Sequence, residues 1–575
     1  MRRAGLAGIV VAAVVLTLPA SAWAHAALLQ TVPEASRTIN AAPAEVRLRF
    51  SEPVEPRFAI VSVTDAAGRQ VTDGDPASTA GSPQTLVTPL RRVPEGWYLV
   101  FWRVISADGH PVRGAFTFAV GPNPGPPPQF RVPSLSETAT TTRLLVSRWV
   151  VFLALLSALG LFVLRAVIAR PLVRAVPGCS LRPLSVAFGA ALGVALVAIP
   201  VYVVLATAQF TLRSAFDLGA VVPPARASGF GRDFLDLELV LGLFGLAALV
   251  SLYLDRPERE QRSVVEVIAL PAALLAGGAA LVLPALAGHA GQKPPRGLSL
   301  PLDVAHLGAA SIWLGGLIGL VVFWVSVGAE NRIAVLAHVV PRFSAVAFCS
   351  VVVLVGTGIG CSFLELPTFA TLWQTSYGKA LLVKIALLFA ALLLAGVNLA
   401  RTKPRLQGAA GIRPSLGPGA AVLLRRLVQG EIVFVAAALF AAAVLTSLAP
   451  PASALARVKD ITARVGPGPV SEVVAKGPYR LRVEVAPNRA ALPNRFSLAI
   501  SRDGRPVRGA QVVSRLDMLD MEMGEQSFRF PERKPGVFVK STPALVMVGH
   551  WALQFEVTPP GGRPFVVTFL DKASG

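Results

Sequence analysis

The sequence has little charge and few cysteines. Of its 575 residues, only 15% are charged and 53% are hydrophobic, whereas soluble globular chains carry about 25% charged residues. This shortage excludes a soluble cytosolic enzyme and a disordered chain, and it favours a polytopic membrane protein. The net charge of +21 could suggest a nucleic-acid partner, but Lys and Arg gather in the cytoplasmic loops of membrane proteins. We therefore expect no nucleic acid.

Other patterns are missing as well. Three cysteines, at positions 179, 349 and 361, are too few for a disulfide scaffold. No G-x-x-x-x-G-K-[ST] loop occurs, so we expect no ATP-driven pump. The initiator aside, methionine is absent before residue 518.

Residues 1–24 resemble a secretory signal peptide. Arg2 and Arg3 precede an apolar run, and Ala22-Trp23-Ala24 is an A-x-A cleavage pattern. Cleavage there would make His25 the first mature residue. The alternative is an uncleaved membrane anchor.

Composition divides the rest into four parts. Residues 25–121 alternate in short aromatic and β-branched runs typical of a small β-sandwich. A Pro-rich linker follows at 122–144, then an apolar part at 145–449, and residues 451–575 read as a second exported β-sandwich. The predicted fold is thus a polytopic α-helical membrane protein flanked by two all-β domains.

The apolar part contains eight segments long enough to cross a bilayer, at about 146–166, 184–206, 234–254, 264–287, 303–327, 343–363, 379–400 and 427–448. The loops 165–183, 255–263, 328–342 and 401–426 carry fifteen Lys and Arg, and the opposite loops carry five. The positive-inside rule makes the first set cytoplasmic and places both β-domains on the periplasmic or extracellular side of the cytoplasmic membrane.

The N-terminal domain carries a candidate metal site. A mature His25 offers an α-amine and an imidazole, and Asp108 and His110 lie two residues apart in a turn. This nitrogen-rich set suits Cu(II). The alternative is a surface turn with an incidental N-terminal histidine.

The same domain resembles the CopC copper-binding family, through His25-Ala26, Thr31-Val32-Pro33 and the longer blocks 46–54 and 98–118. The resemblance implies a Cu(II) site formed by His25, Asp108 and His110. Some family members add a methionine-rich Cu(I) site, but this domain has no methionine.

Ionisable residues in the membrane part mark a second candidate site. His289 follows the fourth span, and Asp303 and His306 share one face of the fifth. They form a candidate metal entry site, and helix capping is the alternative. The region resembles the CopD membrane family through His289, 303–306, 311–317, 341–344, 357–358, 377–384, Asn398 and Glu431. This resemblance implies copper passage.

Lys384 and Glu431 lie deeper, and we expect either a structural ion pair between them or a place on the ion path. We interpret Cys349 and Cys361 as packing residues, because twelve residues on one helix separate them by about 18 Å.

The C-terminal domain holds Met518, Met521, Met523 and Met547, with His550 three residues beyond the last. Thioether sulfur favours Cu(I), whereas methionine also fills gaps in ordinary cores. The segment loosely resembles YtkA-like domains.

These observations predict a non-enzymatic protein that captures Cu(II) outside and passes copper across the cytoplasmic membrane, in contact with lipid and with other exported copper carriers. One alternative is a membrane-anchored copper buffer or sensor for copper resistance. A copper-dependent oxidase and a haem protein are further alternatives.

Overall fold

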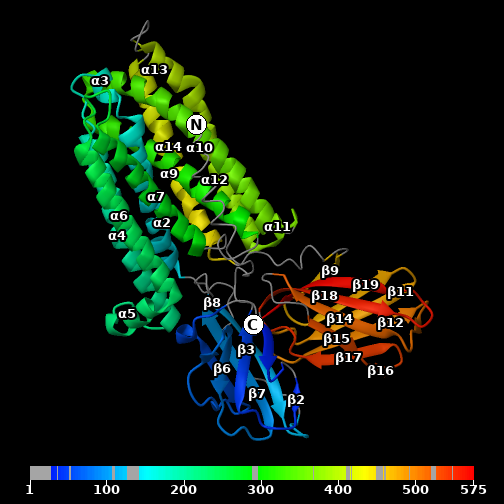
Figure 1. Cartoon of the computed structure of the whole chain (residues 1–575). Helices are drawn as coiled ribbons and strands as arrows, with labels where there is room; N and C mark the ends of the chain where they lie inside the picture. Colours follow the sequence, from blue (N-terminus) through cyan, green and yellow to red (C-terminus); the bar gives the residue numbers. More distant parts are fainter. Residues whose placement is uncertain are drawn as a thin grey trace. The chain divides into compact units, whose positions relative to one another are not determined.

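The computed structural model describes residues 28–34, 37–50, 53–105, 111–125, 128, 141–287, 295–366, 368–409, 415, 417–448, 458, 461–490, 492–519, 526–546 and 548–574. The chain divides into two compact units, one helical and one containing the β-strands (Figure 1).

The N-terminal domain is a sandwich of two four-stranded sheets. Alternation along β3, where Val46, Leu48 and Phe50 are buried and Arg47 and Arg49 are exposed, confirms the predicted period of two. One sheet has the order β1-β3-β6-β5 and the other β2-β8-β7-β4. The strands are β1 (Leu28–Val32), β2 (Thr38–Ile39), β3 (Glu45–Phe50), β4 (Ile60–Asp65), β5 (Ala77–Thr79), β6 (Ser82–Pro89), β7 (Gly96–Ile105) and β8 (Pro111–Val120).

The eight predicted membrane segments are confirmed as helices. In the described part of the chain, eight helices are long and apolar enough to cross a membrane. They are α2 (Thr142–Val163) with the π-helical η2 (Leu164–Ile168), α4 (Arg182–Thr211), α6 (Gly229–Leu254), α7 (Val264–Ala287), α9 (Arg296–Ser326), α10 (Ala329–Glu365), α12 (Ser376–Val397) with the π-helical η3 (Asn398–Thr402), and α14 (Gly417–Leu445). Shorter helices are α3 (Leu172–Ala175), α5 (Leu218–Ala227), α11 (Thr371–Gln374) and α13 (Lys403–Ala409).

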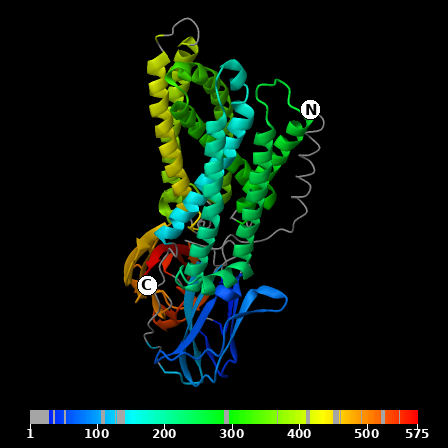
Figure 2. The ribbon, with the colours of Figure 1, turned by 90° about the vertical axis from the view of Figure 1, so that its left-hand side faces the viewer.

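Several helices are longer than their apolar segments. The sixth begins at Ala329, so residues 329–342, predicted as a loop, are its first turns. The helices run alongside one another (Figure 2), with α5 at one end of the bundle and α3 and α13 at the other (Figure 1).

Small residues let α2 and α9 approach closely. A Cβ at Gly160 would lie 1.8 Å from the carbonyl oxygen of Ser311, and one at Gly315 would lie 2.3 Å from the backbone of Gly160. Only glycine fits such a contact between membrane helices. Part of the 311–317 motif therefore serves helix packing.

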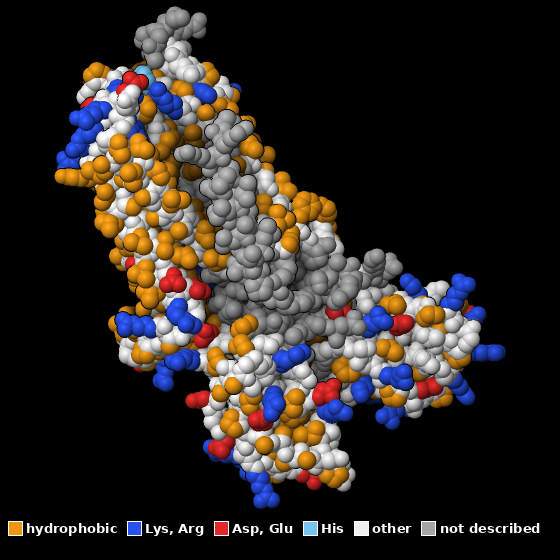
Figure 3. Space-filling view, in the orientation of Figure 1, with side chains coloured by type: hydrophobic (Ala, Val, Ile, Leu, Met, Phe, Trp, Pro, Cys, Tyr) orange, Lys and Arg blue, Asp and Glu red, His pale blue; other side chains and the backbone are white. Residues whose placement is uncertain are grey.

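Outward faces of the helices are apolar. Val186 and Val197 on α4, and Leu239 and Leu243 on α6, are exposed, and hydrophobic side chains cover this side of the bundle (Figure 3). Exposed apolar helix faces of this extent fit a lipid environment.

The C-terminal domain has two sheets, as predicted. Their orders are β10-β11-β12-β17-β16, with β13 beside β12, and β15-β14-β18-β19-β9. The strands are β9 (Ile461–Val465), β10 (Val470–Lys476), β11 (Tyr479–Ala486), β12 (Asn494–Arg502), β13 (Arg505–Pro506), β14 (Gln511–Met518), β15 (Gln526–Phe530), β16 (Glu532–Lys534), β17 (Val537–Thr542), β18 (Gly549–Thr558) and β19 (Phe565–Ala573).

Candidate copper sites

The predicted N-terminal ligands His25, Asp108 and His110 lie outside the described residues. The strands around them are described. Ile105 at the end of β7 pairs with Pro111 at the start of β8, so Asp108 and His110 belong to the connection of this hairpin.

The start of β1 lies at the same end of the sandwich as this connection. Leu28 pairs with Phe50 at the end of β3, and the Phe50 ring contacts the Trp102 ring, with centroids 5.4 Å apart. Trp102 precedes the end of β7 by three residues. The chain segment that follows His25 therefore begins near the end of β7 that leads to Asp108.

In the helical unit, His306 on α9 is linked to Thr357 on α10. The His306 Nδ1 atom lies 3.0 Å from Thr357 Oγ1. The Thr357 hydroxyl has two carbonyl acceptors for its one hydrogen, Val353 at 2.6 Å and Leu354 at 3.2 Å. These acceptors favour the tautomer in which the Thr357 oxygen accepts from a protonated Nδ1. This assignment leaves the Nε2 lone pair of His306 available as a ligand. In metal-binding histidines, one ring nitrogen binds the metal and the N–H of the other typically donates to an acceptor such as this one.

Charged and polar groups gather near His306. Lys384 on α12 interacts electrostatically with Asp303 on α9, Cys361 on α10 and His306. Cys361 also interacts with Glu365 at the end of α10. Cys361 therefore lies in a polar cluster rather than only in packing, a placement that sequence spacing could not show because it depends on three helices meeting.

Of the two roles expected for Lys384 and Glu431, an ion pair with each other or a place on the ion path, the described residues do not form the ion pair. Glu431 on α14 is only 2% exposed and accepts a hydrogen bond from Asn398 Nδ2 in η3. Lys384 precedes Asn398 by fourteen residues, about 21 Å along a helix. The two ionisable groups thus belong to opposite halves of the bundle, because Glu431 on α14 contacts the η3 end of α12 and Lys384 lies far from that end.

Within the described ranges, no three His, Cys, Asp or Glu side chains are grouped so as to hold a metal ion. His289, the third residue of the predicted entry site, lies outside these ranges. Asp303 and His306 do lie three residues apart on one helix, as predicted.

At the α3 end, charged residues form a buried network. Asp255 accepts from Arg165 at 2.7 Å and from Arg170 at 2.8 Å, and all three side chains are at most 7% exposed. Glu266 accepts from the backbone N–H of Arg256 at 2.6 Å. This network joins α6 to η2 and to the segment before α3. Sequence spacing gives no sign of it, because Asp255 lies 90 and 85 residues from its two arginine partners.

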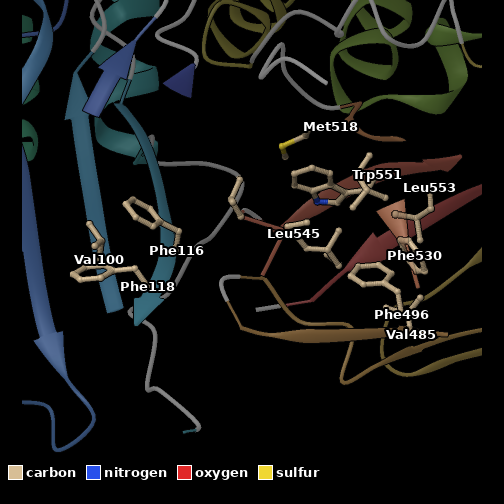
Figure 4. Close-up of a cluster of buried hydrophobic side chains, with 14 of the residues drawn as sticks. Val100, Phe116, Phe118, Val485, Phe496, Met518, Phe530, Leu545, Trp551 and Leu553 are labelled. Atoms are coloured by element: carbon tan, nitrogen blue, oxygen red, sulfur yellow. The ribbon is translucent and has the colours of Figure 1, made fainter. Parts of the chain in front are cut away.

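In the C-terminal domain, Met518 is 3% exposed and pairs across strands with Trp551, which pairs with Asp571. Met518 lies beside the Trp551 indole in a cluster of buried apolar side chains (Figure 4), so its placement is that of a core residue. His550 is half-buried, and Met521, Met523 and Met547 lie outside the described residues.

Comparisons with known proteins place two families in the chain. Residues 28–121 match the model of the CopC domain, and residues 337–445 match that of copper resistance protein D, CopD. Neither range includes residues 451–575, so the YtkA-like character of that part stays a prediction.

Individual relatives also carry the names of copper proteins. The copper transport protein CutJ of Bacillus subtilis is 25% identical over 93% of this chain and 94% of its own length. Copper resistance protein C of Escherichia coli is 34% identical over 17% of this chain and 84% of its length. The crystal structure of CopC from Methylosinus trichosporium OB3b is 33% identical, covers 18% of this chain and 99% of its own, and has a TM-score of 0.17.

These names belong to copper resistance and copper transport proteins rather than to enzymes. Two family models in one sequence, together with eight apolar helices, confirm the predicted combination of a CopC domain and a helical membrane part. The chain therefore belongs to the copper resistance family in which a CopC domain and a CopD membrane domain are joined in one polypeptide.

Proposed function

We propose that the chain binds Cu(II) at its N-terminal domain and passes copper through its helical unit into the cell. The N-terminal ligands are His25, Asp108 and His110, on the periplasmic or extracellular side. Support comes from the β-sandwich, whose strand ends bring the start of β1 toward the β7–β8 connection.

The hydrogen bond between His306 and Thr357 carries the transport half of the proposal. It holds the imidazole with Nε2 free to receive a metal ion. With Asp303 on the same helix and His289 before it, His306 would form the entry site. Cys361, which interacts electrostatically with Asp303 and Lys384, brings to the same region a soft sulfur of the kind that suits Cu(I).

Labelled copper uptake into liposomes that contain the purified full chain tests this function. We expect His306→Ala to reduce uptake at least tenfold. His338→Ala is the matched control, because His338 bonds the Ala334 carbonyl of its own helix and lies far along α10 from Thr357. Equal uptake by wild type and His306→Ala would contradict an entry site at this histidine.

A Cu(II) titration of the full chain tests the capture step. His110→Ala should weaken Cu(II) binding by at least about 100-fold if the imidazole is a direct ligand, since even the outer partners of ligands contribute 10–100-fold. Unchanged affinity would remove His110 from the site.

The second candidate is a membrane-anchored copper buffer or sensor. The lack of a complete three-ligand group among the described membrane residues favours it. Copper binding without any uptake by the wild-type protein would establish this alternative and end the transport proposal.

A further inference from the structure

Glu431 and Asn398 meet where α12 changes to the π-helical η3, at the end of the bundle that carries α13, and Thr402 lies four residues beyond Asn398 on η3. Glu431 from α14 accepts a hydrogen bond from Asn398 Nδ2. Asn398 Oδ1 and Thr402 Oγ1 are buried and have no partner among the described residues. Thr402 is completely buried and Glu431 is 2% exposed.

The two unpartnered oxygens call for a donor. Buried polar atoms in native proteins are almost always hydrogen-bonded, and each exception needs an explanation such as a bound ion or water. Asn398 Oδ1 can only accept, and Thr402 Oγ1 can accept as well as donate. Single π-helical turns occur often at functional sites, and this one includes both residues.

Among the residues that the structure describes, Glu431 has no positively charged partner. Several elements pack against α14, and their described charged or titratable side chains can be named in full. They are Arg143 and Arg148 on α2, Asp303 and His306 on α9, Glu330, Arg332, His338, Arg342, Cys349, Cys361 and Glu365 on α10, Tyr377, Lys379 and Lys384 on α12, Arg401 on η3, and Lys403 and Arg405 on α13, with Arg425 and Arg426 on α14 itself. Burial and the Asn398 bond dominate the electrostatics of Glu431, and none of these groups contributes.

A buried carboxylate without a counter-charge requires a cation or a proton. An all-oxygen set of carboxyl, amide and hydroxyl is a poor site for Cu(I), which prefers sulfur and nitrogen. A proton on the carboxyl group would at once neutralise it and supply an O–H donor. The observations therefore favour a proton over copper.

We propose that Glu431, Asn398 and Thr402 form a proton-binding site whose carboxyl group takes up and releases one proton as copper passes. The step forms one O–H bond on the carboxylate and breaks it on release, with no change of oxidation state. This inference rests on the proposed transport function. The proposed proton site lies where η3 follows α12, in the opposite half of the bundle from Lys384.

Infrared difference spectroscopy of the full chain in lipid tests proton binding without transport. Wild type should show the C=O band of a protonated buried carboxyl group, and Glu431→Gln should lose it. Glu431→Asp should restore a carboxyl band. If Glu431→Gln does not fold, Asn398→Leu serves instead and should shift the band, because it removes the Nδ2 donor. An unshifted band, or no band that depends on Glu431, overturns the proposal.

Proton movement is then followed with a pH-sensitive dye enclosed in the liposomes of the copper uptake assay. Copper-dependent proton flux should fall at least tenfold in Glu431→Gln. The control is Glu238→Gln, which removes another membrane carboxyl group with a buried oxygen, on α6 and outside the CopD-matched range; it should leave the flux unchanged.

The outcomes separate the two proposals. Copper uptake by wild type without proton flux, or unchanged flux in Glu431→Gln, overturns the proton site and leaves transport intact. Absence of uptake by wild type defeats the transport function, and the infrared band then decides the proton site alone.

Discussion

Phe50 and Trp102 pack edge to face, with ring centroids 5.4 Å apart and ring planes at 69°. They come from β3 and β7 of opposite sheets, and both are at most 1% exposed. This contact lies at the end of the sandwich where β1 starts and β7 ends. It links the core of the domain to the segments that carry the proposed Cu(II) ligands.

Gly114 provides a test of this link. A Cβ at this position would lie 2.6 Å from Cζ2 of the paired Trp102, so Gly114→Ala must displace the indole. We expect a loss of about 1–3 kcal/mol in stability, typical of overpacking, and roughly tenfold weaker Cu(II) binding. Isothermal titration of the full chain measures the affinity.

The control for Gly114→Ala is Gly189→Ala on α4, where a Cβ meets open space. Its Cu(II) affinity should equal that of wild type. Wild-type affinity in Gly114→Ala would show that the Trp102 contact does not position the site.

Thr357→Val removes the oxygen that accepts from His306 Nδ1 while keeping the side-chain shape. Copper uptake should fall by about 10–100-fold, the usual effect of losing the partner of a ligating histidine. Ser350→Ala is the control, since Ser350 bonds the Val346 carbonyl of its own helix. An equal loss of copper uptake in both variants would mean that any change in α10 impairs uptake, and it would contradict a specific role of the His306 hydrogen bond.

Asp255→Asn should destabilise the helical unit by about 3–5 kcal/mol, because it leaves Arg165 and Arg170 buried without their counter-charge. Thermal unfolding in detergent measures the change. Glu260→Gln should shift stability by at most about 1 kcal/mol, since its pair with Arg174 is 3.8 Å long and solvent-exposed on the Glu260 side. Comparable losses in the two variants would contradict the buried-network interpretation.

Asp571 makes the C-terminal domain sensitive to pH. Burial raises the pKa of Asp571 to about 6, above the value of about 3.9 in an unfolded chain. The folded state therefore binds this proton more tightly, and the stabilisation is present below about pH 4 and lost as the pH rises through 6. The change amounts to roughly 2–3 kcal/mol.

Hydrogen exchange of β18 and β19 in the full chain checks this prediction. Protection should fall between pH 5 and pH 7 beyond the intrinsic pH effect on exchange rates, and Asp571→Asn should remove that extra fall. If Asp571→Asn shows the same extra fall in protection as wild type, the pH dependence belongs to another group. His550, which acts on Asp571 with the opposite sign, is the next to replace.

The sequence by itself determined the order of parts, the eight helices, the two β-domains and the copper family. Length and hydropathy of a segment suffice for a membrane helix, and period-two alternation suffices for strands such as β3, because these signals are local. The shared helical face of Asp303 and His306 was equally readable from their spacing.

Only the tertiary structure decided which side chains meet across helices. It joined His306 to Thr357, placed Cys361 and Lys384 together, and separated Lys384 from Glu431 in favour of the Asn398 bond. Sequence spacing gives the face and depth of a residue on its own helix, but not which neighbouring helix covers that face. That choice depends on close contacts such as Gly160 against Gly315, which are set by the packing of the whole bundle.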